Sequence, residues 1–155
     1  MRRLLYLSLI ERLKTLTDDN GQPVIKTFDL WNEQVEFIEQ EEIFAMPAVF
    51  IEMQPLKWAT LGGDSQQADA TVRLHILTPW DGSSRDGSQF QEQTLARFDL
   101  LDRIDRCLFN LTADDGQAQI YMFRRSGTAT NHNHGEVVED ISDHSFRVTQ
   151  RIKRG

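Results

Sequence analysis

Apolar residues recur at helical spacing near the start of the chain. Within residues 4–16 they return at every third or fourth position and would lie along one side of a helix: Leu5, Leu9, Leu13 and Leu16. The polar residues 17–21 favour a turn, and Pro23 prevents the helix from resuming. The pattern therefore predicts an amphipathic helix over 4–16 that packs by its leucine side.

A second, longer helix is predicted over residues 89–111. Ser88 and Gln91 have the spacing of a capping box, in which the two side chains bond free backbone groups of the first turn. Cys107 lies beside the apolar side of this helix, where a small buried thiol is expected rather than a reactive one. Six apolar residues at helical spacing predict the side that faces the core: Leu95, Phe98, Leu101, Ile104, Leu108 and Leu111.

The segments between the two helices have the patterns of strands. Residues 47–53 form a short apolar run, which is typical of a strand buried on both faces. Residues 24–31 mix β-branched and aromatic side chains and predict a further strand. Residues 58–61 and 69–78 predict a hairpin with an exposed polar tip at 62–67. The glutamate-rich residues 33–44 fit an edge strand or a short amphipathic helix equally well.

The last third of the chain predicts three more strands, at 119–125, 136–141 and 146–152. The polar residues 126–135 are expected to form a loop or ribbon tip, and residues 142–144 a turn between the last two strands. The whole order predicts an α+β fold of one domain, 1–155, with two helices packed on one face of a mainly antiparallel sheet with long hairpin loops.

Charge and composition narrow the classes of function. The chain has 155 residues, of which 39% are hydrophobic and 26% charged, so it is expected to fold. The net charge of -7 disfavours a protein that binds DNA or anionic lipid through uniform attraction. A single cysteine excludes an intrachain disulfide and fits a reducing cytoplasm. The absence of a run of 18 uncharged apolar residues predicts that no segment spans a membrane.

Catalytic and metal-binding patterns are weak. His132 and His134 are two positions apart, so on a strand they would point the same way and could share a metal, with His144 or Glu136 as a third ligand. Solvated residues in a polar tip explain the same pattern. The sequence contains no nucleophile elbow and no glycine-rich phosphate loop. We therefore expect no enzyme, no cofactor and no bound metal.

Basic and aromatic residues suggest two kinds of contact surface. The late strands carry a local excess of basic side chains, which fits either a nucleic-acid-binding face or a charged sheet edge that deters aggregation: Arg124, Arg125, Arg147, Arg151, Lys153 and Arg154. Three tryptophans fall in or beside loops and strand ends, where they would anchor protein contacts or complete the core: Trp31, Trp58 and Trp80.

The order of elements resembles a family of phage assembly proteins. An amphipathic helix precedes a β region with Met46-Pro47-Ala48-Val49-Phe50-Ile51, a hairpin through Gly62-Gly63 to Val72-Arg73-Leu74-His75-Ile76, a long helix at 89–111 and terminal strands. Over most of the chain, this is similar to the small tail-terminator and tail-completion proteins of long-tailed bacteriophages and prophages. Those proteins share an α+β fold and assemble as hexameric rings.

The resemblance implies a structural role in the virion. The chain would form a ring that caps the tail tube and joins it to the head, in contact with tail-tube and head-connector proteins. DNA would only pass through the ring, and no membrane would be involved. Assembly would take place in the host cytoplasm, and the product would belong to the virion tail. The alternatives are a head-completion or neck connector protein, and a nucleic-acid adaptor that uses the late arginines.

Three segments are the expected contact regions on this interpretation. They are the hairpin at 58–69, the loop at 80–87 and the tip at 126–135, because long polar ribbons with embedded aromatic residues can reach a neighbouring subunit. The residues expected to make assembly contacts are Trp58, Trp80, Arg73, Arg124 and Arg125.

Overall fold

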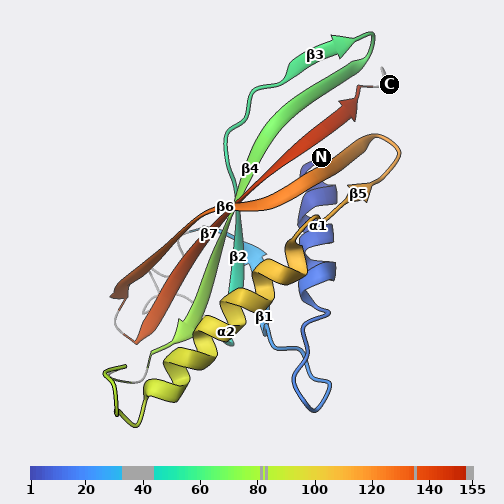
Figure 1. Ribbon diagram of the computed structural model, residues 1–155. Coiled ribbons are helices and arrows are strands. Elements are labelled where there is room, and N and C mark those ends of the chain that lie inside the picture. Colours follow the sequence, from blue (N-terminus) through green and yellow to red (C-terminus); the bar gives the residue numbers. More distant parts are fainter. Residues whose placement is uncertain (33–43, 81, 83, 135, 153–155) are drawn as a thin grey trace.

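A curved, mainly antiparallel sheet of seven strands organises the molecule (Figure 1). The computed structural model describes residues 1–32, 44–80, 82, 84–134 and 136–152. The strands lie in the order β1, β2, β4, β7, β6, β5, and β3 pairs with the part of β4 that β2 does not reach. The elements are α1 (Arg2–Leu13), β1 (Thr27–Leu30), β2 (Ala48–Met53), β3 (Ala59–Gly62), β4 (Ser65–Pro79), α2 (Gln91–Leu108), β5 (Ala113–Asp114), β6 (Ala118–His134) and β7 (Val137–Arg151).

Both helices pack into one core against the same face of the sheet. Alternate residues of β4 face this core because side chains along a strand point to opposite faces in turn. The helices and β4 contribute these buried residues: Leu5, Leu9 and Leu13 from α1, Leu100, Ile104 and Leu108 from α2, and Ala68, Ala70, Val72, Leu74 and Ile76 from β4. The predicted α+β fold with two helices on one face of an antiparallel sheet is confirmed.

A smaller apolar cluster occupies the other face of the sheet. Phe50 and Leu77 belong to it, and Trp31 packs against its edge. The Trp31 ring stacks on the ring of His75, with centroids 3.7 Å apart and planes 6° from parallel. Trp31 therefore completes a core, whereas Trp58 and Trp80 keep 37% and 39% of their surface exposed. The residues between 33 and 43, where the glutamates were expected to form a strand or helix, lie outside the described residues.

β7 buries polar side chains beneath α2. Asp140 pairs in register with Ile76 and so faces the helices. Its carboxylate accepts a hydrogen bond from Thr130 Oγ1 at 2.6 Å and lies 3.5 Å from Nε of Arg97 on α2. Two strand positions further along, Ser142 Oγ and His144 Nε2 are 2.9 Å apart. A buried carboxylate and its arginine thus connect α2 to the sheet.

In the last third of the chain, one prediction is wrong and one pair of alternatives is decided. Residues 142–144 do not form a turn, because β7 is one continuous strand from Val137 to Arg151. Of the two alternatives expected over residues 126–135, the ribbon is observed and the loop is not, because residues 126–134 extend β6 and pair with β7. The polar residues mislead the pattern because the sheet itself satisfies them: Asp143, for example, accepts two hydrogen bonds from Arg73 of the neighbouring strand.

The start and the buried side of α2 also differ from expectation. The helix begins at Gln91 with Phe90 as its N-cap, and no side chain caps it. Ser88 Oγ instead accepts the Phe90 N–H inside the preceding turn, so the capping box does not form. Leu95 and Phe98 were expected in the core but are 44% and 48% exposed. The helix is rotated about its axis so that Leu100 is buried in the core instead.

The Arg97–Asp140 contact predicts a large effect of one substitution. Replacing Arg97 with Met leaves the buried Asp140 carboxylate without its cation, so we expect the free energy of unfolding to fall by about 3 kcal/mol. The matched control is Arg147→Met, because Arg147 pairs with Asp69, whose side chain is 80% exposed, so this variant should lose much less stability than Arg97→Met. Urea denaturation at pH 7 measures both, and equal losses would contradict the buried contact.

His144 predicts a pH dependence of stability. Burial lowers the pKa of His144 from 6.5 to about 4. The unfolded chain then binds the extra proton between these two pH values, so stability falls as pH drops from about 6.5 toward 4. The contribution lost between pH 7 and pH 5 is about 2 kcal/mol. Urea denaturation at both pH values should show that His144→Leu removes this part of the loss, whereas the exposed-site control His132→Leu retains it.

Candidate functional site

The structure separates the three expected contact segments into two ends of the molecule. The loop after β4 and the tip of β6 lie together: the Trp80 N–H donates to the Glu136 carbonyl at 2.7 Å, and the Trp80 ring meets the His132 ring edge-on at 6.1 Å. Trp58 lies at the other end, before β3, where the hairpin projects (Figure 1). β4 spans the distance between the ends with 15 residues, or roughly 45 Å.

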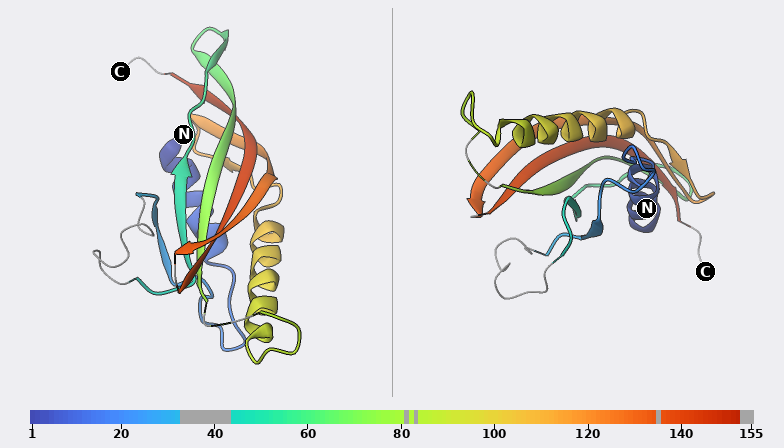
Figure 2. Two further views of the ribbon diagram at one scale, coloured as in Figure 1. Left: turned by 90° about the vertical axis from the view of Figure 1, so that its left-hand side faces the viewer. Right: turned by 90° about the horizontal axis from the view of Figure 1, so that it is seen from below.

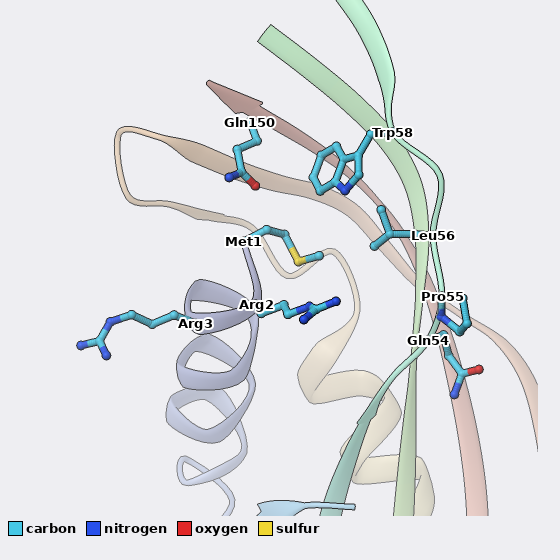
Figure 3. A pocket seen from close by; sticks show the side chains of 8 residues that line it. All are labelled: Met1, Arg2, Arg3, Gln54, Pro55, Leu56, Trp58 and Gln150. Carbon is cyan, nitrogen blue, oxygen red and sulfur yellow. The ribbon is translucent and has the colours of Figure 1, made fainter. Parts of the chain in front are cut away.

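A groove lies beside Trp58 at the first turn of α1. Its volume is about 580 Å³, and the residues that line it come from α1, from the connection between β2 and β3, and from β7: Met1, Arg2, Arg3, Gln54, Pro55, Leu56, Trp58 and Gln150. Figure 3 shows Arg2 extending from α1 toward the β2–β3 connection and Arg3 extending away from it. None of these described lining residues is acidic. The groove therefore combines a cationic wall with an apolar wall of Leu56 and Trp58.

Arg73, Arg124 and Arg125 do not form one basic face. Arg73 binds Asp143 through Nε and Nη2, at 2.8 and 3.2 Å. Arg125 points to the helix side, where its Nη2 lies 3.5 Å from Asp105 of α2. Arg124 lines a shallow hollow of about 320 Å³ that also includes Asp69 and Arg147. The late arginines are thus distributed over both faces of the sheet, and carboxylates compensate several of them.

The histidines are not brought together as a metal site. His144 is buried in the middle of β7 and stacks on Phe123, with ring centroids 5.1 Å apart. The tip is remote from it, because His134 pairs with Val137, seven positions or roughly 23 Å along the same strand. Within the described residues, no group of three His, Cys, Asp or Glu side chains is placed to hold a metal ion.

The outer side of α2 is an exposed surface, although its apolar residues were predicted to lie in the core. The solvent-facing side of α2 carries Leu95 and Phe98 together with the exposed carboxylates Glu92, Asp99 and Asp102. All five lie within about 120° of the helix circumference, opposite the buried residues. Leu100, Ile104 and Leu108 form a second stripe at helical spacing, which overlaps the predicted stripe at Ile104 and Leu108. Choosing that second stripe would have given the observed orientation of α2.

Comparisons with known proteins relate the chain to a virion component through its fold. No protein-family model and no curated protein matches the sequence. A chain from the solved structure "Virion of native gene transfer agent (GTA) particle" is similar at a TM-score of 0.50 and 10% identity, with 96% of each chain covered. Another solved structure, titled only with a sequence identifier, has a TM-score of 0.45 and 15% identity, with 100% of this chain and 99% of that one covered.

At these identities, the likeness concerns the fold. In the described part of the chain, no helix has the length and apolar character needed to cross a membrane. What this chain shares with the chain from the gene transfer agent virion is the fold.

Proposed function

We propose that this protein is a structural component of a phage or prophage tail, which forms a ring that caps the tail tube and joins it to the head. The observation that supports this most directly is the fold shared with a virion chain over 96% of both chains. The sequence resemblance to tail-terminator proteins, which rests on the order of the elements, points to the same class of protein.

The distribution of exposed apolar residues supports a ring. Trp58 and Leu61 are exposed at one end of the molecule, and Leu95 and Phe98 are exposed on α2. Different apolar surfaces on one subunit favour heterologous contacts, which close into a ring when the rotation between neighbours allows it. The core contains neither surface, so both are free to bury area against another chain without a change of fold.

The electrostatics support a ring through which DNA passes. A net charge of -7 provides carboxylates that repel DNA phosphates from a lumen. In this role the protein catalyses no reaction and needs no cofactor. Its partners are tail-tube and head-connector proteins. Assembly takes place in the host cytoplasm and ends in the virion tail.

Two alternatives differ from this proposal in what the ring or subunit binds. A head-completion or neck connector would bind portal-side proteins in place of the tail tube. A nucleic-acid adaptor would need a continuous basic face, and the ion pairs of Arg73, Arg125 and Arg147 with carboxylates weaken that interpretation.

Self-association is the first prediction of the proposal. Mass photometry and sedimentation at low salt should show one closed oligomer of the size of a hexamer, because heterologous contacts end when the ring closes. Adding purified tail-tube protein from the same genome should produce a capped tube visible by electron microscopy. A protein that remains monomeric at high concentration, both alone and with the tube protein, would contradict the proposal.

Weak DNA affinity is the second prediction. Fluorescence anisotropy with a labelled DNA duplex at about 0.15 M salt should show no binding that depends on the late arginines, because Arg125 and Arg147 are paired with carboxylates and the protein is acidic. Binding that weakens steeply with salt and is lost in Arg124→Gln and Arg125→Gln would favour the adaptor instead.

A further inference from the structure

We propose that the groove beside α1 of one copy binds the solvent-facing side of α2 from a second copy. This inference rests on the proposed ring and names the two surfaces that build it. The groove is the hollow of about 580 Å³ lined by Arg2, Leu56 and Trp58. The helix surface is the side of α2 that carries Leu95 and Phe98.

The helix surface has the chemistry of a ligand. Leu95 and Phe98 are 44% and 48% exposed and lie one turn apart, so together they form an apolar ridge. Glu92, Asp99 and Asp102 flank the ridge and are exposed, and Arg106, whose Nε donates to the Asp102 carbonyl, is the exposed cation on the same side. This part of α2 therefore presents apolar side chains inside a border where three exposed carboxylates outnumber the one exposed cation, Arg106.

The groove has the matching chemistry. Leu56 and the indole of Trp58 supply an apolar wall, and Arg2 projects from α1 toward it (Figure 3). Arg3 is exposed and is also among the lining residues, and the exposed Lys57 lies between Leu56 and Trp58 in the sequence. No carboxylate is among the described lining residues, so the local charge is positive in a protein whose net charge is -7. An apolar helix face in an apolar groove with opposite charges at the border is a recurring mode of recognition.

One copy cannot join its own two surfaces. Arg97, next to Phe98, contacts Asp140, which pairs with Ile76 near the end of β4. Trp58 instead precedes β3, which pairs with Gln67 near the start of β4. Nine strand positions, or roughly 30 Å, separate these places, and both views in Figure 2 show α1 and α2 apart at these ends. The contact is therefore intermolecular and heterologous, as a ring requires.

Charge reversal tests the contact with a built-in rescue. One variant carries Arg2→Glu and Arg3→Glu, and the other carries Glu92→Lys and Asp99→Lys. Each alone places like charges across every interface, so its midpoint concentration for oligomerisation in mass photometry should rise at least about tenfold. An equimolar mixture should recover the wild-type oligomer, because each groove then meets a helix of opposite charge. Lys14→Glu with Lys26→Glu is the matched control and should assemble as the wild type does.

Cysteine cross-linking tests the geometry independently of charge. In a Cys107→Ala background, Trp58→Cys in one chain and Phe98→Cys in another should form a disulfide-linked heterodimer under mild oxidation, whereas Leu7→Cys, on the exposed side of α1, should not link to Phe98→Cys. Circular dichroism of each variant at pH 7 establishes that it is folded before it is scored.

The outcomes separate this inference from the proposed function. A wild-type ring with no rescue in the mixture and no Trp58–Phe98 cross-link overturns this interface and leaves the ring intact. Variants that assemble normally but no longer bind tail-tube protein show that the groove takes a different protein, which also overturns it. A wild-type chain that never assembles overturns the proposed function itself.

Discussion

The pairing of β4 with β7 is the constraint on which the rest of the structure depends. Fifteen residues of one strand are in continuous antiparallel register with fifteen of the other, from Ser65 with Arg151 to Pro79 with Val137. Because side chains alternate between faces, this single register decides which residues meet the helices and which meet the second cluster. A slip of one position would expose Val72 and Leu74 and would turn Arg73 and His75 into the core. The register also fixes the length of the molecule and so the separation of its two ends.

The position of α2 follows from that register. Asp140 and His144 face the helices because Ile76 and Val72 do, and the Asp140 carboxylate, out of contact with bulk water, is compensated by Arg97 of α2. At the other end of the helix, Asp105 meets Arg125 of β6. The burial of Leu100, Ile104 and Leu108 sets the rotation of α2 about its axis together with these two ionic contacts, and that rotation leaves Leu95 and Phe98 in solvent. The exposed ridge is therefore a consequence of how the helix is bound to the sheet.

Local patterns predicted the elements but not their extents or faces. The leucine spacing of α1 and the apolar run of β2 were sufficient, because α1 buries residues at helical spacing and β2 buries four consecutive residues. The continuity of β7 through Ser142, Asp143 and His144 could not be predicted, because those polar residues resemble a turn until their partners are known. The same holds for the candidate site: Trp58 was predicted to make an assembly contact, whereas the groove beside it needs α1, the β2–β3 connection and β7 together.

Cross-strand and helix–sheet partners thus decide which apolar residues remain available for assembly. The chain buries two helices on one face of its sheet, and on the second face the described residues form a smaller cluster around Phe50 and Leu77. Among the exposed apolar side chains of the described residues, Leu95 and Phe98 lie on α2, and Trp58 and Leu61 lie at the projecting hairpin, two places that one copy cannot bring into contact. Their burial requires another molecule, and because the two surfaces differ in charge as well as in shape, a copy turned head to tail satisfies both at once.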